Sequence, residues 1–290
     1  MRAGVAAAGA AAPRVRALRR RLAIALVHAA LVAATILTLL PLLWMVSASL
    51  MPAGEASMVP PRWLPSAPTL EHYRALFARL DLARAFANSL GIAVATTVVS
   101  VTLNGLAGYA FARFRFPGRD RIFAILLLAL VIPGQLGMLP LFLMLRGLGL
   151  VNTYLGVVVP GLASIFGIFL VRQYALGIPQ SLLDAARVDG AGELRIFWSV
   201  VVPLCRPVLV TLALFTFMGT WNDFLWPLVV LSDSRLQTLP VALANLLGEH
   251  VQDTELMMAG AVLTVLPVVV VFLALQRSYI EGIASGSVKQ

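Results

Sequence analysis

Asp223 is the ionisable side chain whose position most suggests a functional site, because it lies in a long apolar stretch. An unpaired carboxylate in a membrane helix is costly, so such a residue indicates function. Asp223 and its neighbours Trp221 and Asn222 are candidates for lining a transport pathway. The alternative is an interfacial acid that caps or pairs locally, because the helical rise puts Asp223 about 30 Å beyond Pro203. Trp221 and Trp226 fit an interfacial aromatic belt equally well.

The polar segment 184–191 is a second candidate, and its residue types indicate docking of another protein rather than catalysis. Pro179 suits a first helical turn, so a short helix is predicted at 180–188. Gly190 can end that helix in the left-handed cap conformation. Two small residues, Ala185 and Ala186, leave a face that a partner can approach closely.

An amphipathic helix is predicted after this turn, leading into the next apolar stretch. Its apolar stripe consists of Leu194, Phe197, Trp198 and Val201. The two helices and the sharp turn between them predict a rigid lever. By spacing alone, partner docking and a plain connecting loop remain equally open.

No combination of residues in the chain supports enzyme chemistry, although a membrane enzyme is not excluded. Lys289 is the only lysine, so the G-x-x-x-x-G-K-[ST] loop that holds nucleotide phosphates is absent. The histidines, His28, His72 and His250, are isolated, and Cys205 is the single cysteine. Neither a metal cluster nor an internal disulfide is expected. We predict no catalytic residue, no metal and no cofactor in this chain.

Composition indicates that most of the chain lies in a membrane. Hydrophobic residues make up 60% and charged residues 12% of the 290 residues, and the mean hydropathy is +0.92. Soluble domains are roughly 25% charged. The charge-free stretches are far longer than barrel strands, and most reach the about 20 apolar residues that a spanning helix needs. We predict an all-α fold with six transmembrane helices, at 22–50, 88–112, 122–145, 154–171, 203–231 and 257–276.

The distribution of arginine predicts how the chain is threaded. With a cytoplasmic N-terminus, 16 of the 22 lysine and arginine residues lie in inside segments and 6 lie outside, as the positive-inside rule expects. The net charge of +9 therefore reflects topology and not nucleic-acid binding, and both termini are cytoplasmic. The predicted organisation is a basic tail at 1–21, one transmembrane domain at 22–276 and a C-terminal tail at 277–290. Within the domain, 51–87 is an outside loop and 172–202 a cytoplasmic loop.

Three prolines, Pro133, Pro140 and Pro160, interrupt the third and fourth predicted spans. Intramembrane prolines break backbone hydrogen bonds that neighbouring helices usually satisfy. The three prolines therefore indicate structural kinks. Alternatively, they belong to a hinge or a cavity wall.

The cytoplasmic loop resembles the EAA motif of ATP-binding-cassette (ABC) importer permeases, which reads E-A-A-x-x-x-G, nine residues, then I-x-L-P. This chain has Asp184-Ala185-Ala186, three residues, Gly190, nine residues, then Val200-Val201-Val202-Pro203. Aspartate replaces the usual glutamate, and two valines replace isoleucine and leucine. Further segments resemble the carbohydrate-uptake branch, most of all the second membrane subunit of maltose-type transporters. They are Tyr109–Phe114, Ile132–Pro133, Leu139–Leu141, Leu148–Thr153, Trp221–Phe224 and Glu281–Lys289.

The resemblance implies a type I importer permease fold in a prokaryotic cytoplasmic (inner) membrane. One of two related permease subunits, this chain would form half of the pathway for a sugar or sugar derivative. Two copies of a separate P-loop ATPase would bind ATP and Mg, and an extracytoplasmic binding protein would deliver the solute. The loop would be the coupling helix, contacting the ATPase through Asp184, Ala185, Ala186, Asp189, Gly190 and Gly192. The tail would also reach the ATPases, through Gly282, Gly286 and Lys289.

Other interpretations of the sequence remain. Within the same class, the solute could be a polyol or a glycerol phosphate ester. From other classes, an ion-coupled secondary transporter would need charged or ion-coordinating groups near the membrane midplane. A membrane enzyme would need a catalytic pair of side chains, and no such pair is evident.

Overall fold

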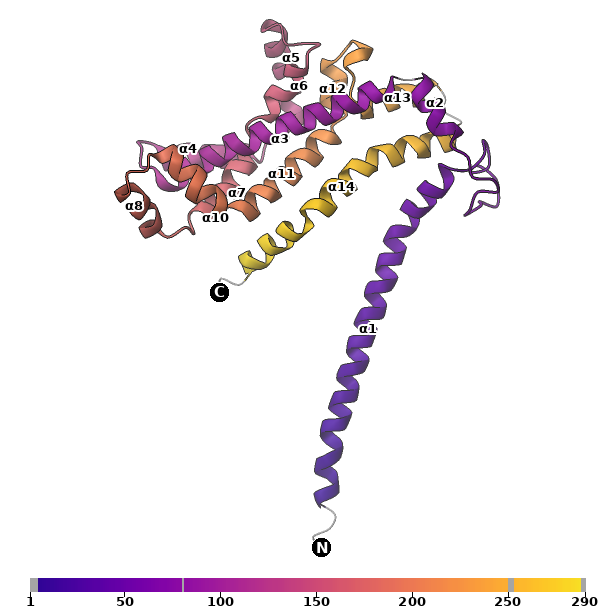
Figure 1. Cartoon of the computed structure of the whole chain (residues 1–290), viewed down its shortest axis with the longest axis horizontal. Coiled ribbons are helices and arrows are strands. Elements are labelled where there is room, and N and C mark those ends of the chain that lie inside the picture. Colours follow the sequence, from indigo (N-terminus) through magenta and orange to yellow (C-terminus); the bar gives the residue numbers. More distant parts are fainter. Residues whose placement is uncertain (1–4, 80, 250–252, 288–290) are drawn as a thin grey trace. The chain divides into compact units, whose positions relative to one another are not determined.

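The computed structural model describes residues 5–79, 81–249 and 253–287, and all regular structure in these residues is helical (Figure 1). The all-α prediction is confirmed for this part of the chain. The α-helices are α1 (Val5–Ala48), α2 (Glu71–Arg79), α3 (Leu82–Arg113), α4 (Arg119–Ala129), α5 (Met138–Gly147), α6 (Tyr154–Val158), α7 (Ile165–Ala175), α8 (Gln180–Val188), α9 (Glu193–Ile196), α10 (Val202–Leu204), α11 (Arg206–Trp221), α12 (Leu225–Val230), α13 (Leu239–Glu249) and α14 (Thr254–Ser287). Short 3₁₀-helices are η1 (Gly134–Gly137), η2 (Val159–Gly161) and η4 (Ser234–Leu236), and η3 (Phe197–Val201) is a π-helix.

The chain divides into two compact units, residues 1–72 with 252–262 and residues 73–251 with 263–290. In the first unit, the loop after α1 is held by two buried carboxylates. Glu55 accepts hydrogen bonds from Arg62 at 2.9 Å and from the amide and hydroxyl of Ser66. Glu255, at the start of α14, accepts the amide hydrogen of Ala56 at 2.7 Å. The proline-rich half of the predicted outside loop is therefore folded around fixed charges.

Helix α3 is the central helix of the second unit and packs along α7 and α11. Its buried face includes the small and polar side chains that allow membrane helices to pack closely. Asn104 shows how this face is used. Its side chain donates to the Ser100 hydroxyl at 2.7 Å and accepts the Ser164 amide hydrogen at 2.9 Å. The start of α7 is thus fixed on the middle of α3.

Gly108→Ala is expected to disrupt the contact between α3 and α7. A Cβ atom at this position would lie 2.7 Å from Cβ of Val171 and 3.0 Å from the backbone nitrogen of Arg172. The helices would have to separate, and overpacking typically costs ~1–3 kcal/mol. Gly91→Ala, on the same helix with no atom within 4 Å of its Cβ, is the matched control. Thermal unfolding in detergent should show a lower midpoint for Gly108→Ala alone, and equal midpoints would contradict the close approach.

Three of the six predicted spans are continuous in the described residues, and three are broken. Continuous apolar segments of 30, 32 and 23 residues lie in α1, α3 and α14. The other three are bent helix pairs: α4 with η1–α5 (98°), α6–η2 with α7 (40°), and α9–α10 with α11 (84°). The predicted six spans result if each bent pair is one span, and the bends are the part of the fold that the predicted ranges do not show. Hydropathy detects the length of an apolar segment, but it does not detect where the backbone hydrogen bonds of the helix are interrupted.

The predicted span at 203–231 differs most from the structure. The chain turns at Cys205, where Pro203 and Pro207 begin new helices because proline suits a first turn and lacks an amide hydrogen. Helix α11 then ends at Trp221, and α12 begins only at Leu225. Pro203 and Asp223 therefore do not lie on one straight helix. The predicted distance of about 30 Å between them assumed such a helix, so it does not place Asp223 at the membrane surface.

Candidate functional site

Helix α8 has the predicted bounds and ends in a fixed turn. It spans Gln180–Val188, and Gly190 follows with φ of +80°. The Gly190 amide donates to the Arg187 carbonyl and the Ala191 amide donates to the Ala186 carbonyl, each at 3.0 Å. These two bonds form a Schellman cap. The turn after α8 is therefore defined by the backbone conformation that glycine allows.

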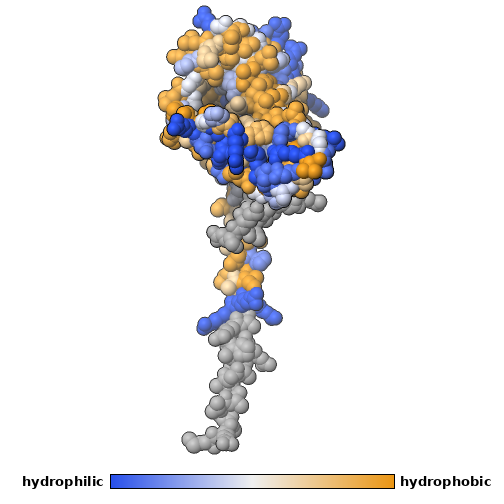
Figure 2. Space-filling view, turned by 90° about the vertical axis from the view of Figure 1, so that its left-hand side faces the viewer, coloured by the Kyte–Doolittle hydropathy of each residue, from blue (hydrophilic) through white to orange (hydrophobic). Residues whose placement is uncertain are grey.

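One face of α8 is anchored and the other is exposed. Leu183 is fully buried, and Ala186 packs in the same apolar cluster with residues of α3, α9 and α11. Val188, an exposed apolar residue that the sequence analysis did not single out, is 87% exposed. The other predicted docking residues are exposed: Asp184, Ala185, Asp189, Gly190 and Gly192. Figure 2 views the side that bears α8 in Figure 1, and hydrophilic residues gather there beside a hydrophobic surface.

A chain of polar contacts connects α8 to α3. Asp184 accepts a hydrogen bond from Arg187 at 2.8 Å, and Arg187 also donates to Glu193 at 2.8 Å. Glu193 in turn accepts the hydroxyl hydrogen of Tyr109, on α3, at 3.1 Å. The bonds to Glu193 and then Asp184 raise the pKa of Arg187 above its ordinary value. The shorter aspartate at the motif's first position thus has a partner within α8.

Arg113, at the end of α3, is a functional candidate that the sequence analysis missed. Its guanidinium donates to the carbonyls of Ala175 (2.7 Å), Leu176 (3.2 Å) and Ile178, and to the side chain of Gln180 (3.2 Å). These acceptors are the end of α7 and the start of α8. In the sequence analysis, Arg113 counted only as one of the arginines that indicate topology and as part of the segment Tyr109–Phe114. Its role depends on carbonyls that come together through folding.

The predicted apolar stripe after the turn is only half correct. Phe197 and Val201 are buried, but Leu194 and Trp198 are 67% and 54% exposed, and Ile196 is fully buried instead. After Ile196 the chain forms a π-helix at 197–201, which changes the angular spacing of side chains from that of an α-helix, and Trp198 lies in this segment. The buried face therefore does not follow the 3.6-residue period on which the prediction depended.

A cavity of about 380 Å³ lies in the second unit, where the broken spans meet the middle of α3. Residues of α3, η1–α5, α6–η2 and the break between α11 and α12 form its wall. Non-helical backbone in a membrane is tolerated where it lines a cavity, and discontinuous helices form transporter substrate sites. Pro160 is in this wall, as the cavity interpretation of the prolines expected. The polar and aromatic lining residues are Thr96, Gln135, Thr220, Asp223 and Trp226.

The three pathway candidates have different positions. Asp223 lines the cavity, and its carboxylate also accepts the Trp226 amide hydrogen at 3.3 Å, so the pathway interpretation and the local-capping part of the alternative both have a structural basis. Asn222 is exposed, and Trp221 is buried with its indole donating to the Thr264 carbonyl at 2.9 Å. Neither lines this cavity. The aromatic-belt interpretation is wrong for both tryptophans, because both indoles are buried. The indole of Trp226 donates to the Gly156 carbonyl at 3.1 Å.

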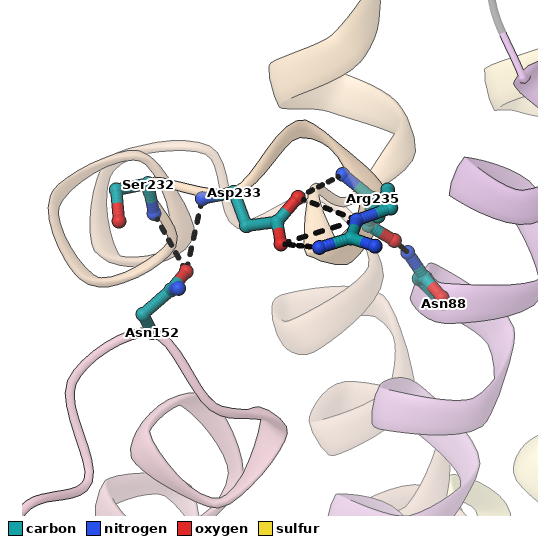
Figure 3. Close-up of polar contacts among 5 residues, drawn as sticks. All are labelled: Asn88, Asn152, Ser232, Asp233 and Arg235. Atoms are coloured by element: carbon teal, nitrogen blue, oxygen red, sulfur yellow. Dashed lines mark hydrogen bonds and ion pairs between the residues drawn. The ribbon is translucent and has the colours of Figure 1, made fainter.

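Asn152 connects loops near the N-terminal end of α3 (Figure 3). It has φ of 59°, a conformation that asparagine tolerates better than most residues. Its side-chain oxygen accepts the amide hydrogens of Ser232 and Asp233 at 3.1 and 2.9 Å. Asn88 donates to the Arg235 carbonyl at 2.9 Å, and Arg235 holds the pKa of Asp233 below its ordinary value. The segment after α12 is therefore fixed to both α3 and the loop before α6.

The predicted contacts of the C-terminal tail cannot be built into a site. Gly282 and Gly286 fall in the last turns of α14, and Lys289 lies outside the described residues. Among the residues that the structure describes, no group of three or more His, Cys, Asp or Glu side chains could hold a metal ion.

Comparison with known proteins identifies the family. Residues 104–283 match the model of the binding-protein-dependent transport system inner membrane component, and the chain belongs to this family. The arabinooligosaccharides transport system permease protein AraQ of Halalkalibacterium halodurans is 39% identical over 252 residues, 86% of this chain and 90% of AraQ. The lactose transport system permease protein LacG of Rhizobium radiobacter is 34% identical over 272 residues, 94% of this chain and 98% of LacG.

A solved structure has the same fold. A chain in the crystal structure of a bacterial ABC transporter involved in the import of the acidic polysaccharide alginate matches with a TM-score of 0.77 and 26% identity. The match covers 89% of this chain and 97% of that chain.

The chain is therefore a multi-pass inner-membrane permease of a binding-protein-dependent ABC importer. It is the permease component and not the ATPase, and its family functions without a cofactor in this subunit. It works in a complex with a periplasmic binding protein and ATPase partners. The secondary-transporter and membrane-enzyme interpretations are wrong.

Proposed function

We propose that this chain forms half of the translocation pathway of a carbohydrate importer, beside a second, homologous permease subunit. AraQ and LacG, which are similar over most of the chain, are named for arabinooligosaccharides and lactose. The cavity offers hydroxyl, amide, carboxylate and aromatic groups, which are suited to a solute rich in hydroxyl groups. A polyol is the related alternative, since it presents the same groups.

The observation that supports energy coupling is the capped and exposed helix α8. In the proposal, two copies of a P-loop ATPase bind from the cytoplasm, and one of them holds α8 in a cleft. The contacts are Asp184, Ala185, Ala186, Asp189, Gly190 and Gly192. The C-terminal residues Gly282, Gly286 and Lys289 make a second contact with the ATPases. Both termini and the 172–202 loop are cytoplasmic, as the arginine distribution favours.

Helix α3 is the proposed route of coupling. Arg113 connects its cytoplasmic end directly to α8, Tyr109 does so through Glu193 and Arg187, and Thr96 lies in the cavity wall. Thr96 and Arg113 are separated by 17 residues of one continuous helix, or about 25 Å. Coupling between two sites requires an element whose state both sites bias. Movement of α8 as the ATPases close would reach the cavity through α3.

The test is affinity purification of the chain in mild detergent, followed by mass spectrometry and ATPase assay. The expected result is one copy of this chain, one second permease and two P-loop ATPase subunits, with ATP hydrolysis stimulated by the periplasmic binding protein. A reproducible single-chain preparation in detergent and in lipid nanodiscs would contradict the proposed assembly. Proteoliposomes of the intact complex then test ATP-dependent uptake of neutral oligosaccharides.

A further inference from the structure

We propose that the cavity at the helix breaks is a solute subsite of this subunit that accepts an uncharged, hydroxyl-rich solute and disfavours an anionic one. The inference rests on the proposed import function and specifies, in addition, that the solute is uncharged. Proteins similar to this chain differ in the charge of the solute. The matched structure comes from an importer of an acidic polysaccharide, whereas LacG is named for lactose, a neutral sugar.

The charge of the cavity wall is the first argument. Among the described residues that line it, Asp223 is the one ionisable side chain, and no lysine, arginine or histidine accompanies it. A carboxylate or phosphate in the cavity would lie close to Asp223 among apolar groups such as Met138 and Leu141. Like charges repel strongly at short range where the dielectric constant is low. The wall therefore lacks the cation that recognition of an anion requires.

Hydrogen-bond capacity is the second argument. Asp223 only accepts hydrogen bonds, whereas the hydroxyls of Thr96 and Thr220 and the amide of Gln135 both donate and accept. Thr96 is buried, and its hydroxyl has no partner in the described protein. A solute hydroxyl can donate to Asp223 and also accept from these groups. An anionic oxygen can only accept, so it leaves Asp223 without a donor from the solute.

The position of Asp223 allows its charge to be separated from its structural role. Its oxygen accepts the amide hydrogen of Trp226 at 3.3 Å, and the Trp226 ring is fixed by its own bond to Gly156. Asparagine retains a side-chain oxygen at the same place. Asp223→Asn therefore removes the charge and preserves the acceptor that holds the start of α12.

The experiment measures binding of two matched probes to the purified whole complex without its binding protein. The probes are methyl glucoside and methyl glucuronide, which differ by a hydroxymethyl group against a carboxylate, and saturation-transfer NMR gives their affinities. We expect the wild-type complex to bind the glucoside about tenfold or more tightly than the glucuronide, a preference of about 1.4 kcal/mol. In Asp223→Asn the preference should fall to about threefold or less because glucuronide binding improves.

Thr220→Val is the matched control within the cavity, because it removes a neutral polar group of the same shape. It should weaken both probes and leave their ratio unchanged. Equal wild-type affinities, or an unchanged ratio in Asp223→Asn, would overturn the subsite. Binding of neither probe by a complex whose ATP hydrolysis still responds to its binding protein would also overturn the subsite, and would leave the importer function intact. A complex without that response would instead count against the proposed function.

Discussion

Gly190→Val is expected to lower ATP-driven import by about tenfold or more while the protein still inserts into the membrane. Gly190 closes the Schellman cap of α8 with φ of +80°. A side chain in this conformation costs about 1–2 kcal/mol, and valine would also crowd the exposed face beside Asp189. Because 1.4 kcal/mol corresponds to a factor of ten, we expect binding-protein-stimulated ATP hydrolysis by the reconstituted complex to fall by about tenfold or more.

Two variants separate the possible causes of that loss. Gly149 has φ of +70° and no atom within 4 Å of the place where a Cβ would lie, so Gly149→Val imposes similar strain in a loop that is remote in sequence from α8. It should lower stability and retain the ATPase response. Gly190→Asn fits the left-handed conformation better than valine does, so it should retain more activity. Full activity of Gly190→Val at equal expression would remove the basis for assigning coupling to this turn.

Local signals predicted α8 well because every one of them acts within ten residues. Proline before the first turn, a run of helix-forming residues and a glycine after Asp189 specify the helix and its cap without help from the rest of the chain. The continuous spans in α1, α3 and α14 were predictable for a similar reason, since uninterrupted apolar length is itself the signal.

The cavity could not be predicted because it depends on where several helices stop. The prolines at 133 and 160 marked two of the breaks, but only folding brings these breaks together with Asp223 and with Thr96 of α3. The error at Trp226 has the same origin. The break after α11 places Trp226 in the cavity wall, whereas Trp221 lies within α11 and stacks on Phe217.

Arg113→Gln is expected to have the second large effect, through loosening of the link between α3 and α8. Arg113 donates to carbonyls of Ala175, Leu176 and Ile178 that have left the regular bonding of α7. A hydrogen bond to a charged group contributes about 1.5–3 kcal/mol. Losing several at once should destabilise the start of α8 by about 3 kcal/mol or more, which is a population change of about a hundredfold.

Hydrogen exchange and ATPase coupling together test this expectation. In Arg113→Gln, the amides from Gly177 to Leu183 should exchange faster, and binding-protein-stimulated ATP hydrolysis should fall by about tenfold or more. Arg115→Gln removes the same charge two residues away, from an exposed side chain, and should change neither measurement. Since α8 retains its own cap in both variants, unchanged exchange in Arg113→Gln would mean that α8 holds its position without the Arg113 bonds. Coupling would then have to reach the cavity through the Tyr109–Glu193 contact or through α9–α11 instead.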